Sequence, residues 1–432
     1  MHSFKKNIIS NFFLFFGILF PVSLILGPTF IEIFSGLLII FFFYDVDKDF
    51  YKKNKFYINI FLVFYLYIVI RSLFFSFEFE KIRSVLFYFR FLLFSCAIIF
   101  ILERVNPKKK FNIKFIFFIF LLLNLDSILQ YYFGKNIFNI PLYNIERASS
   151  FFGKELILGS FLFRLLPLIL ILCVIYKLDF NKNIFKLSIF FSFYFFAVLI
   201  SGERTSIFLL LLTIFLLLIL IKNIRKTLFY SLVFFIIIVF VSTYSHKNPL
   251  KRIYNVTLNQ FFKVEKTQIN TNFTPNIFES YSKGFYFFTR DHQGHYVIAI
   301  RMFLDNPIFG QGTRSFRYVC SQEKFLKLDG ICAAHPHNTF LQLLAETGLV
   351  GFSFIFFFII FLSKEIILKF LHNIIDKQID SKFVQIKYIS LIAIFVNLFP
   401  FAPSGNFFNN WLSFVYYYPI AFYIYSINQI KK

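Results

Sequence analysis

The stretch HPHNTFLQLLAETGLVGFSFIFFFIIFL, residues 335–362, decides the fold class, because a short polar start leads into a long apolar run. From residue 340 this run is long enough to cross about 30 Å of hydrocarbon as a helix. Similar runs recur along the whole chain, which is 58% hydrophobic and only 16% charged. A soluble domain carries more charge than this. The sequence therefore predicts an all-α polytopic membrane protein.

About twelve membrane-spanning helices are predicted from these runs, at residues 7–26, 28–44, 57–75, 84–102, 115–133, 156–176, 187–201, 206–221, 228–242, 340–362, 384–400 and 410–426. They divide the chain into residues 1–242 with the first nine helices, one large loop at residues 243–339, and residues 340–432 with the last three. The loop is too long for a plain connector, which predicts that it has a function.

The net charge of +23 is carried mainly by the short links between apolar runs. If the N-terminus is cytoplasmic, the cytoplasmic segments hold 23 Lys and Arg, whereas the short outer loops at 76–83, 134–155 and 201–205 hold six. Because cationic loops stay in the cytoplasm, this imbalance predicts that both termini are cytoplasmic and that the large loop is periplasmic. The charge therefore indicates membrane topology and not nucleic-acid binding.

The polar start of the opening stretch is expected to lie where the large loop re-enters the membrane. Pro336 favours an extended backbone at His335, and a helix is expected to begin near Asn338 or Thr339, both suitable N-caps. A histidine is the natural general base near neutral pH, so His335 and His337 are candidates for catalysis. A capped helix entry without a catalytic role is the alternative.

Asn338, Gln342 and Glu346 recur at positions i, i+4 and i+8, so they share one face of the predicted helix. Polar groups inside a span usually face the bundle interior or a cavity, and this stripe is expected to line a cavity below the histidines. A purely structural stripe is the alternative. Gly348 and Gly351 are expected to allow close contact with another helix.

Arginines on the outer side form the second group of candidates. Arg204 lies in the short turn SGERTS, where its guanidinium is well placed to bind the phosphate of a lipid. Arg147 lies on another outer loop, Arg301 on a helix predicted from about residue 295 to 304, and Arg314 just after a glycine turn. For any one of them a headgroup anchor or a surface charge is the alternative, and Arg317 is interpreted in that way.

No metal site or cofactor is predicted. Asp45 and Asp47 in YDVDKDF resemble a nucleotide-sugar metal motif, but the predicted topology puts them in a cytoplasmic loop. His292 and His295, taken with the two histidines of the opening stretch, match no standard zinc spacing. Four cysteines are too few for a disulfide scaffold, yet Cys320 and Cys332 share one polar loop and are expected to pair in an oxidising compartment. Within the fifth span, Asp126 is either a cavity residue or a structural one.

These features resemble the O-antigen ligase and polymerase family of bacterial envelope enzymes. The marks of the resemblance are the twelve-span layout, the large outer loop between spans nine and ten, and the pair His337–Asn338 followed by nine residues and Gly348. RASSFFGKELILGSFL, SGERTS and DNPIFGQG are similar to further family segments. The resemblance implies the type-C glycosyltransferase fold and a glycan donor carried on undecaprenyl diphosphate, without nucleotide or metal.

The resemblance also implies roles for individual residues. His337 would be the catalytic base, and Arg204 and Arg301 would bind the diphosphate. Residues with expected substrate contacts are Arg147, Asn338, His335, Arg314, Gln342 and Glu346. The enzyme would act at the periplasmic face of the bacterial inner membrane, in contact with membrane lipids.

Three functions remain open at this point. A ligase would pass the glycan to lipid A-core or a related acceptor, whereas a polymerase would pass it to the next repeat unit. The single dominant outer loop favours the ligase. A lipid-linked glycan transporter is the alternative of another class, but transporters usually contain internal repeats, and no matching halves are visible in the sequence.

Overall fold

The computed structural model describes residues 17–75, 79–104, 111–144, 146–262, 288–326, 330–376 and 379–431. A helix covers most of the described part of every predicted span, although some spans extend beyond their helix, as 384–400 does beyond Asn397; residues 7–16 of the first span fall outside the described residues. The helices at the predicted spans are Gly17–Leu26, α2 (Pro28–Asp45), α3 (Lys48–Phe75), α4 (Phe79–Leu86), α5 (Arg90–Arg104), α6 (Phe111–Phe133), α7 (Leu158–Ile175), α8 (Ile184–Ile200), α9 (Arg204–Leu220), α10 (Arg225–Thr243), α16 (Thr339–Ile375), α17 (Lys382–Asn397) and α18 (Asn410–Ile430).

Within the described ranges, seven helical segments are long and apolar enough to cross a membrane, and three shorter helices are also apolar. Together with the lack of any β-strand in those ranges, this fits a polytopic membrane protein. The exact number of twelve spans and the periplasmic position of the large loop stay predictions.

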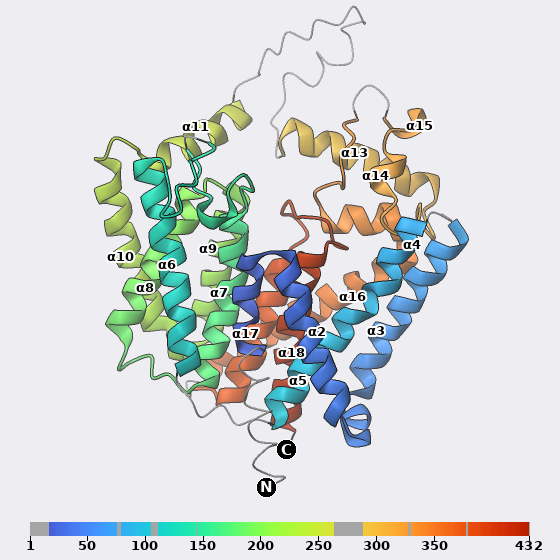
Figure 1. The fold of residues 1–432 in the computed structure, drawn as a ribbon, viewed down its shortest axis with the longest axis horizontal. Coiled ribbons are helices and arrows are strands. Elements are labelled where there is room, and N and C mark those ends of the chain that lie inside the picture. The colour runs from blue at the N-terminus through green and yellow to red at the C-terminus, as the bar shows by residue number, and fades with distance from the viewer. Residues whose placement is uncertain are drawn as a thin grey trace, which may run out of the picture.

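The helices form one bundle (Figure 1). In α7 94% of the apolar window is buried, whereas in the segment that contains α10 only 22% is buried. A helix that is apolar all round and buried lies in the interior, and an apolar helix with an exposed face suits contact with lipid. α7 is therefore an interior helix, and it packs against α8, α9 and α17.

The large loop carries helices of its own: α11 (Pro249–Phe262), α13 (Arg290–Asp305), α14 (Phe316–Val319) and α15 (Glu323–Leu326). α11 and α13 lie across one end of the bundle, and the C-terminal end of α18 reaches the opposite end (Figure 1). α13 begins earlier than the predicted residue 295, because the Thr289 side chain caps the helix by accepting from the His292 N–H. It ends at the Asp305-Asn306-Pro307 sequence, as predicted.

α16 is not the continuous helix that the sequence predicts, because Gly348 interrupts it with φ 62° and ψ −169°. Two helices result, 339–347 and 349–375. The turn at residues 306–312 enters the break: the Gln311 and Gly312 N–H groups donate to the carbonyls of Ala345 and Glu346, at 2.8 and 2.9 Å. These bonds satisfy carbonyls that a helix end leaves unpaired.

Gly348 is required at this joint. A Cβ atom there would lie 2.3 Å from the Ile308 carbonyl oxygen and 2.5 Å from the Gly310 nitrogen. The predicted close approach at Gly348 is therefore to a loop and not to another helix. Gly351 does approach a helix, since a Cβ there would lie 2.8 Å from the ring of Tyr67 on α3.

Arg71 of α3 closes the joint from the other side. Its side chain is buried, its Nε donates to the Phe309 carbonyl at 2.7 Å, and its Nη2 donates to the Gly310 carbonyl. The Tyr67 hydroxyl donates to the carbonyl of Thr347, the last residue of the helix 339–347. α3 therefore holds the helix 339–347 and the loop 306–312 together.

Candidate functional site

His337 lies at the entry to α16 with a left-handed backbone, φ 55°. Such a conformation is uncommon for a residue other than glycine and persists only where the surroundings impose it. The His337 carbonyl accepts from the Ser404 N–H at 2.9 Å. The Asn338 side chain accepts from the N–H groups of Phe340 and Leu341, both at 3.0 Å, so Asn338 is the N-cap. This confirms Asn338 as one of the two predicted helix starts.

Four histidines meet around His337. Its ring centroid lies 4.0 Å from that of His335 and 5.3 Å from those of both His292 and His295. His292 and His295 come from α13, so the large loop folds back onto the entry to α16. No three or more His, Cys, Asp or Glu side chains in the described residues form a group that could hold a metal ion.

The histidines at the site are held in the neutral form. Burial and the neighbouring His292 and His295 lower the pKa of His337 to about 4. Burial, His337 and Arg317 lower the pKa of His335 to about 3. The pKa of His292 is also lowered, chiefly by burial. These three rings are therefore uncharged at neutral pH, and His337 is able to accept a proton.

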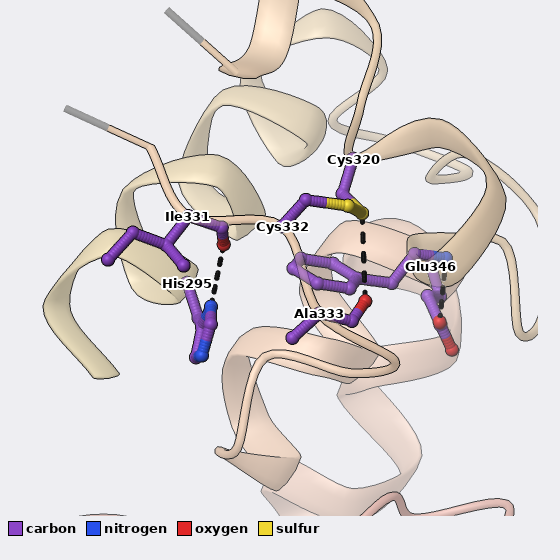
Figure 2. The surroundings of a disulfide bond; sticks show 7 residues. His295, Cys320, Ile331, Cys332, Ala333 and Glu346 are labelled. Carbon is purple, nitrogen blue, oxygen red and sulfur yellow. Dashed lines mark hydrogen bonds between the residues drawn. A yellow bond between two sulfur atoms is a disulfide. The ribbon is translucent and has the colours of Figure 1, made fainter. Parts of the chain in front are cut away.

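A disulfide between Cys320 and Cys332 fixes the segment that leads to the histidines, with a Cα–Cα distance of 5.3 Å. Figure 2 shows two further contacts of the segment around Cys332. The Cys320 sulfur lies 3.6 Å from the Ala333 carbonyl oxygen, and Nδ1 of His295 lies 2.6 Å from the Ile331 carbonyl oxygen. A carbonyl only accepts, so Nδ1 of His295 is the donor of this hydrogen bond.

The polar stripe of α16 is buried and fully hydrogen-bonded. The Asn338 amide donates to the Pro400 carbonyl at 2.9 Å. Gln342 donates to Glu346 and to Asn406 and accepts from the Phe407 N–H. The stripe therefore ties the helix 339–347 to the loop before α18.

Glu346 ties the same helix to the large loop. Its two carboxylate oxygens accept from the N–H groups of Arg314 and Phe316, at 3.0 and 3.1 Å. The expected substrate contacts of Asn338, Gln342 and Glu346 stay predictions, and their hydrogen bonds suit positioning residues.

Arg204 begins α9 at the edge of the histidine cluster. It lies in electrostatic range of His292 and of Arg252, a residue of α11. Gly202, with φ 65°, brings Arg147 and Arg252 together, since a Cβ there would lie 2.9 Å from a side-chain atom of each. Three arginines thus converge on one side of the histidines.

Glu203 fixes the turn that carries Arg204. Its carboxylate accepts from the Gly159 N–H at 2.9 Å and from the Ser160 N–H at 3.2 Å, both at the start of α7. A carboxylate at helix N-termini is stabilised by the helix dipole. Arg147 is fixed as well, since it donates to the carbonyls of Ser201 and Leu156 at 3.1 and 3.0 Å.

Arg314 and Arg317 form a second group of arginines near the cluster. Arg317 is in electrostatic range of His335, and Arg314 is in range of Arg317 and of Arg90 from α5. The structure thus brings Arg317, which the sequence indicated only as a surface charge, close to His335, the second candidate base.

The structure gives Arg301 a different position. Its Nη1 donates to the carbonyls of Phe325 and Leu326 at the end of α15, at 3.0 and 3.4 Å. A cation suits the C-terminal end of a helix. Its predicted contact with a diphosphate gains no support from these bonds and stays a prediction.

Two other candidates have structural partners. Arg104 donates to Asp45 at 2.7 Å and to Asp47 at 2.8 Å. The two carboxylates that resemble a metal-binding motif are therefore paired with an arginine. Asp126 accepts from the Asn136 amide at 3.2 Å and from the Ile137 N–H at 2.9 Å, and so holds an outer loop.

The sequence did not indicate Glu203 and Arg252 as parts of the site. His292 and His295 were considered only as ligands of a zinc site that was not predicted. The α13 pair was detectable, since residues three apart share a helix face. The sequence contains no local signal for Arg252.

Comparison with known proteins gives one family. Residues 189–356 match the family model described as O-Antigen ligase, and no curated protein matches the chain. The matched residues include the histidine cluster, Arg204, Arg252, Arg314 and Arg317. The match supports, in general terms, a ligase or polymerase type of activity on a lipid-linked glycan and a glycan acceptor. The chain is therefore a multi-pass membrane protein that is similar to O-antigen ligases over residues 189–356.

Proposed function

We propose that this protein is a glycosyltransferase that moves a glycan from undecaprenyl diphosphate to lipid A-core or a related acceptor. The reaction takes place at the periplasmic face of the bacterial inner membrane, and both chain termini are cytoplasmic. The observation that carries the proposal is the position of His337, a neutral histidine fixed at a helix start within a cluster of histidines. Arg204 lies in electrostatic range of His292, and Arg317 lies in range of His335.

The proposed reaction is an in-line displacement. The acceptor hydroxyl attacks the anomeric carbon, the bond from that carbon to the diphosphate oxygen breaks, and the configuration inverts. His337 takes the hydroxyl proton, and undecaprenyl diphosphate leaves with the bonding electrons. Fixed cations aimed at the leaving group lower the barrier, so the arginines supply a stabilisation that needs no metal or nucleotide.

The donor is expected to increase the basicity of His337. Burial and the neighbouring histidines lower the pKa of His337 to about 4, which keeps it neutral but weakly basic. An anion bound nearby favours the protonated form and raises the pKa. The diphosphate therefore brings the base closer to the range in which a general base is effective.

Arg204 and Arg252 are the proposed diphosphate ligands, with Arg147 behind them. A groove of about 380 Å³ supports this placement, because it lies between α8, α9 and α10 and is almost entirely apolar. It reaches Ile207, one turn beyond Arg204, and continues along Phe240 of α10. A polyprenyl chain in this groove would place its head group near Arg204.

The remaining candidates have lesser roles in this proposal. Arg314 is a proposed ligand of the acceptor or donor glycan, and His335 is the second candidate base. Asn338, Gln342 and Glu346 position the helix that carries His337. The family resemblance also implies Arg301 as a diphosphate ligand. The proposal favours Arg252 in this role, and variants of the two residues compare them directly.

A polymerase is the second candidate, because the family match covers both activities in general terms. Deletion of the gene separates them. Loss of a ligase leaves long lipid-linked polymer without its final acceptor, whereas loss of a polymerase leaves single repeat units on the acceptor.

The direct test compares His337→Ala and Arg204→Ala with wild-type protein at equal membrane levels, in an assay of glycan transfer. Both variants are expected to lose most activity. His372→Ala is the matched control, because His372 is exposed at the far end of α16. Full activity of His337→Ala would remove the proposed base from the mechanism.

A further inference from the structure

The interior helix α7 contains a buried charge that the proposed mechanism does not use. Arg164 lies in the sequence LGSFLFRLLPLILILCVI, and only 5% of its surface is exposed. A charged side chain inside a membrane bundle is costly and does not stabilise the fold unless it is paired. Arg164 therefore needs either a partner in the protein or a ligand.

Among the described residues, no anion contacts Arg164, and its guanidinium lies over the ring of the adjacent Phe163, 4.4 Å from the ring centroid. Its Nη1 donates to the Ser160 carbonyl at 3.0 Å, within its own helix, and its Nε is buried without a hydrogen-bond partner. It forms no ion pair with any described residue. Glu203 is in electrostatic range, but both of its oxygens already accept from the start of α7.

A buried hydroxyl lies near this arginine. Tyr416 of α18 is buried in electrostatic range of Arg164. Its hydroxyl interacts with the side chain of Thr339, the first residue of α16. Through Glu203 on one side and Thr339 on the other, Arg164 lies next to the residues that carry Arg204 and His337.

We propose that Arg164 and Tyr416 bind a phosphate oxygen of the lipid-linked donor from the membrane side of the site. This inference rests on the proposed function. A guanidinium matches the geometry of phosphate oxygens, and burial strengthens their attraction. Phosphate of a bilayer phospholipid has the same chemistry, so the experiment must separate the two sources.

The chain offers its own reporter for this test. Trp411 is the single tryptophan, and its ring lies 6.1 Å from Phe161, one turn before Arg164 on α7. Full-length protein is titrated with undecaprenyl diphosphate, undecaprenol or phosphatidylglycerol vesicles while Trp411 emission is measured. Only the diphosphate lipid is expected to change the emission. No response at saturation, or an equal response to phosphatidylglycerol, would overturn the assignment.

Variants then test Arg164 itself. Arg164→Met is expected to raise the Kd for undecaprenyl diphosphate at least about tenfold, as loss of a charge-assisted hydrogen bond implies. Its melting temperature is expected not to fall, because an unpaired buried charge has been removed. Arg164→Lys keeps the positive charge but lacks the two parallel N–H donors of a guanidinium, so it should bind undecaprenyl diphosphate with intermediate affinity. Lys226→Met, at an exposed position of α10, is the control for loss of one cation.

The outcomes separate this inference from the proposed function. An unchanged Kd in Arg164→Met, with or without lower stability, gives Arg164 a packing role and overturns the inference alone. If Arg164→Met does not fold, a wild-type Kd in Arg164→Lys has the same meaning. Wild-type protein that neither transfers glycan nor binds the donor would instead refute the proposed function.

Discussion

Replacement of Gly348 by alanine tests the joint that positions the candidate base. The new Cβ would lie 2.3 Å from the Ile308 carbonyl oxygen and 2.4 Å from its carbon, which are backbone atoms that cannot rotate away. The overlap costs about 1–3 kcal/mol, as other overpacked sites do. The backbone at φ 62° and ψ −169° is essentially restricted to glycine and adds about 1–3 kcal/mol. The expected loss of unfolding free energy is therefore roughly 2–6 kcal/mol.

The measurement is the apparent melting temperature of purified protein in one detergent, followed by glycan transfer at equal membrane levels. Gly348→Ala is expected to lower the melting temperature by on the order of 5–10 °C. Gly310→Ala should behave alike, because its Cβ would lie 2.5 Å from the Glu346 carbonyl carbon. Gly36→Ala in α2 is the control, since nothing lies within 4 Å of its Cβ. Wild-type stability and transfer in Gly348→Ala would refute the broken-helix joint.

Three further predictions concern the site. The value of kcat/KM is expected to fall at a pH near 4, where His337 of the free enzyme becomes protonated. The value of kcat is expected to fall at a higher pH, because bound diphosphate raises the pKa of His337. If both values fell at the same pH, the proposed effect of the diphosphate on His337 would be contradicted. Cys332→Ser, which releases the segment from Cys320, is expected to lower glycan transfer roughly tenfold by misplacing the histidines. Unchanged transfer, in protein that contains the additional free thiol of Cys320, would contradict a role of the disulfide in positioning the histidines. Arg252→Leu is expected to raise the KM for donor about tenfold, whereas Arg301→Leu should lower the melting temperature and leave KM unchanged. The opposite pattern would restore Arg301 as the diphosphate ligand.

The helices and the helix cap were accessible from the sequence because both are local. Apolar runs of sufficient length mark helices that lie in a membrane, and the described structure has a helix at each predicted run. Asn338 was identified as a possible cap because a short polar side chain before an apolar helix can accept from the first N–H groups.

The convergence of the site could not be predicted, because it depends on contacts between distant segments. His292 and His295 reach His337 only through the fold of the large loop. The break in α16 was missed because the spacing of the polar stripe fits a continuous helix equally well. The hydrogen bonds of Arg301 could not be predicted for a related reason. The sequence places Arg301 on a helix but does not show that its side chain donates to the end of α15.

The hydrogen bonds from Arg71 to the loop 306–312 have a consequence for the synthesis and folding of the protein. Phe309 and Gly310, which supply the acceptors, follow Arg71 by 238 and 239 positions, so α3 enters the membrane long before they are synthesised. Until then the guanidinium must extend to water or lipid head groups at the bilayer surface. It can turn inward only when the 306–312 turn arrives. The hydrogen bonds of Arg71 therefore form only in chains whose translation has passed that turn, so α3 is fixed to the end of the bundle with the candidate site late in synthesis.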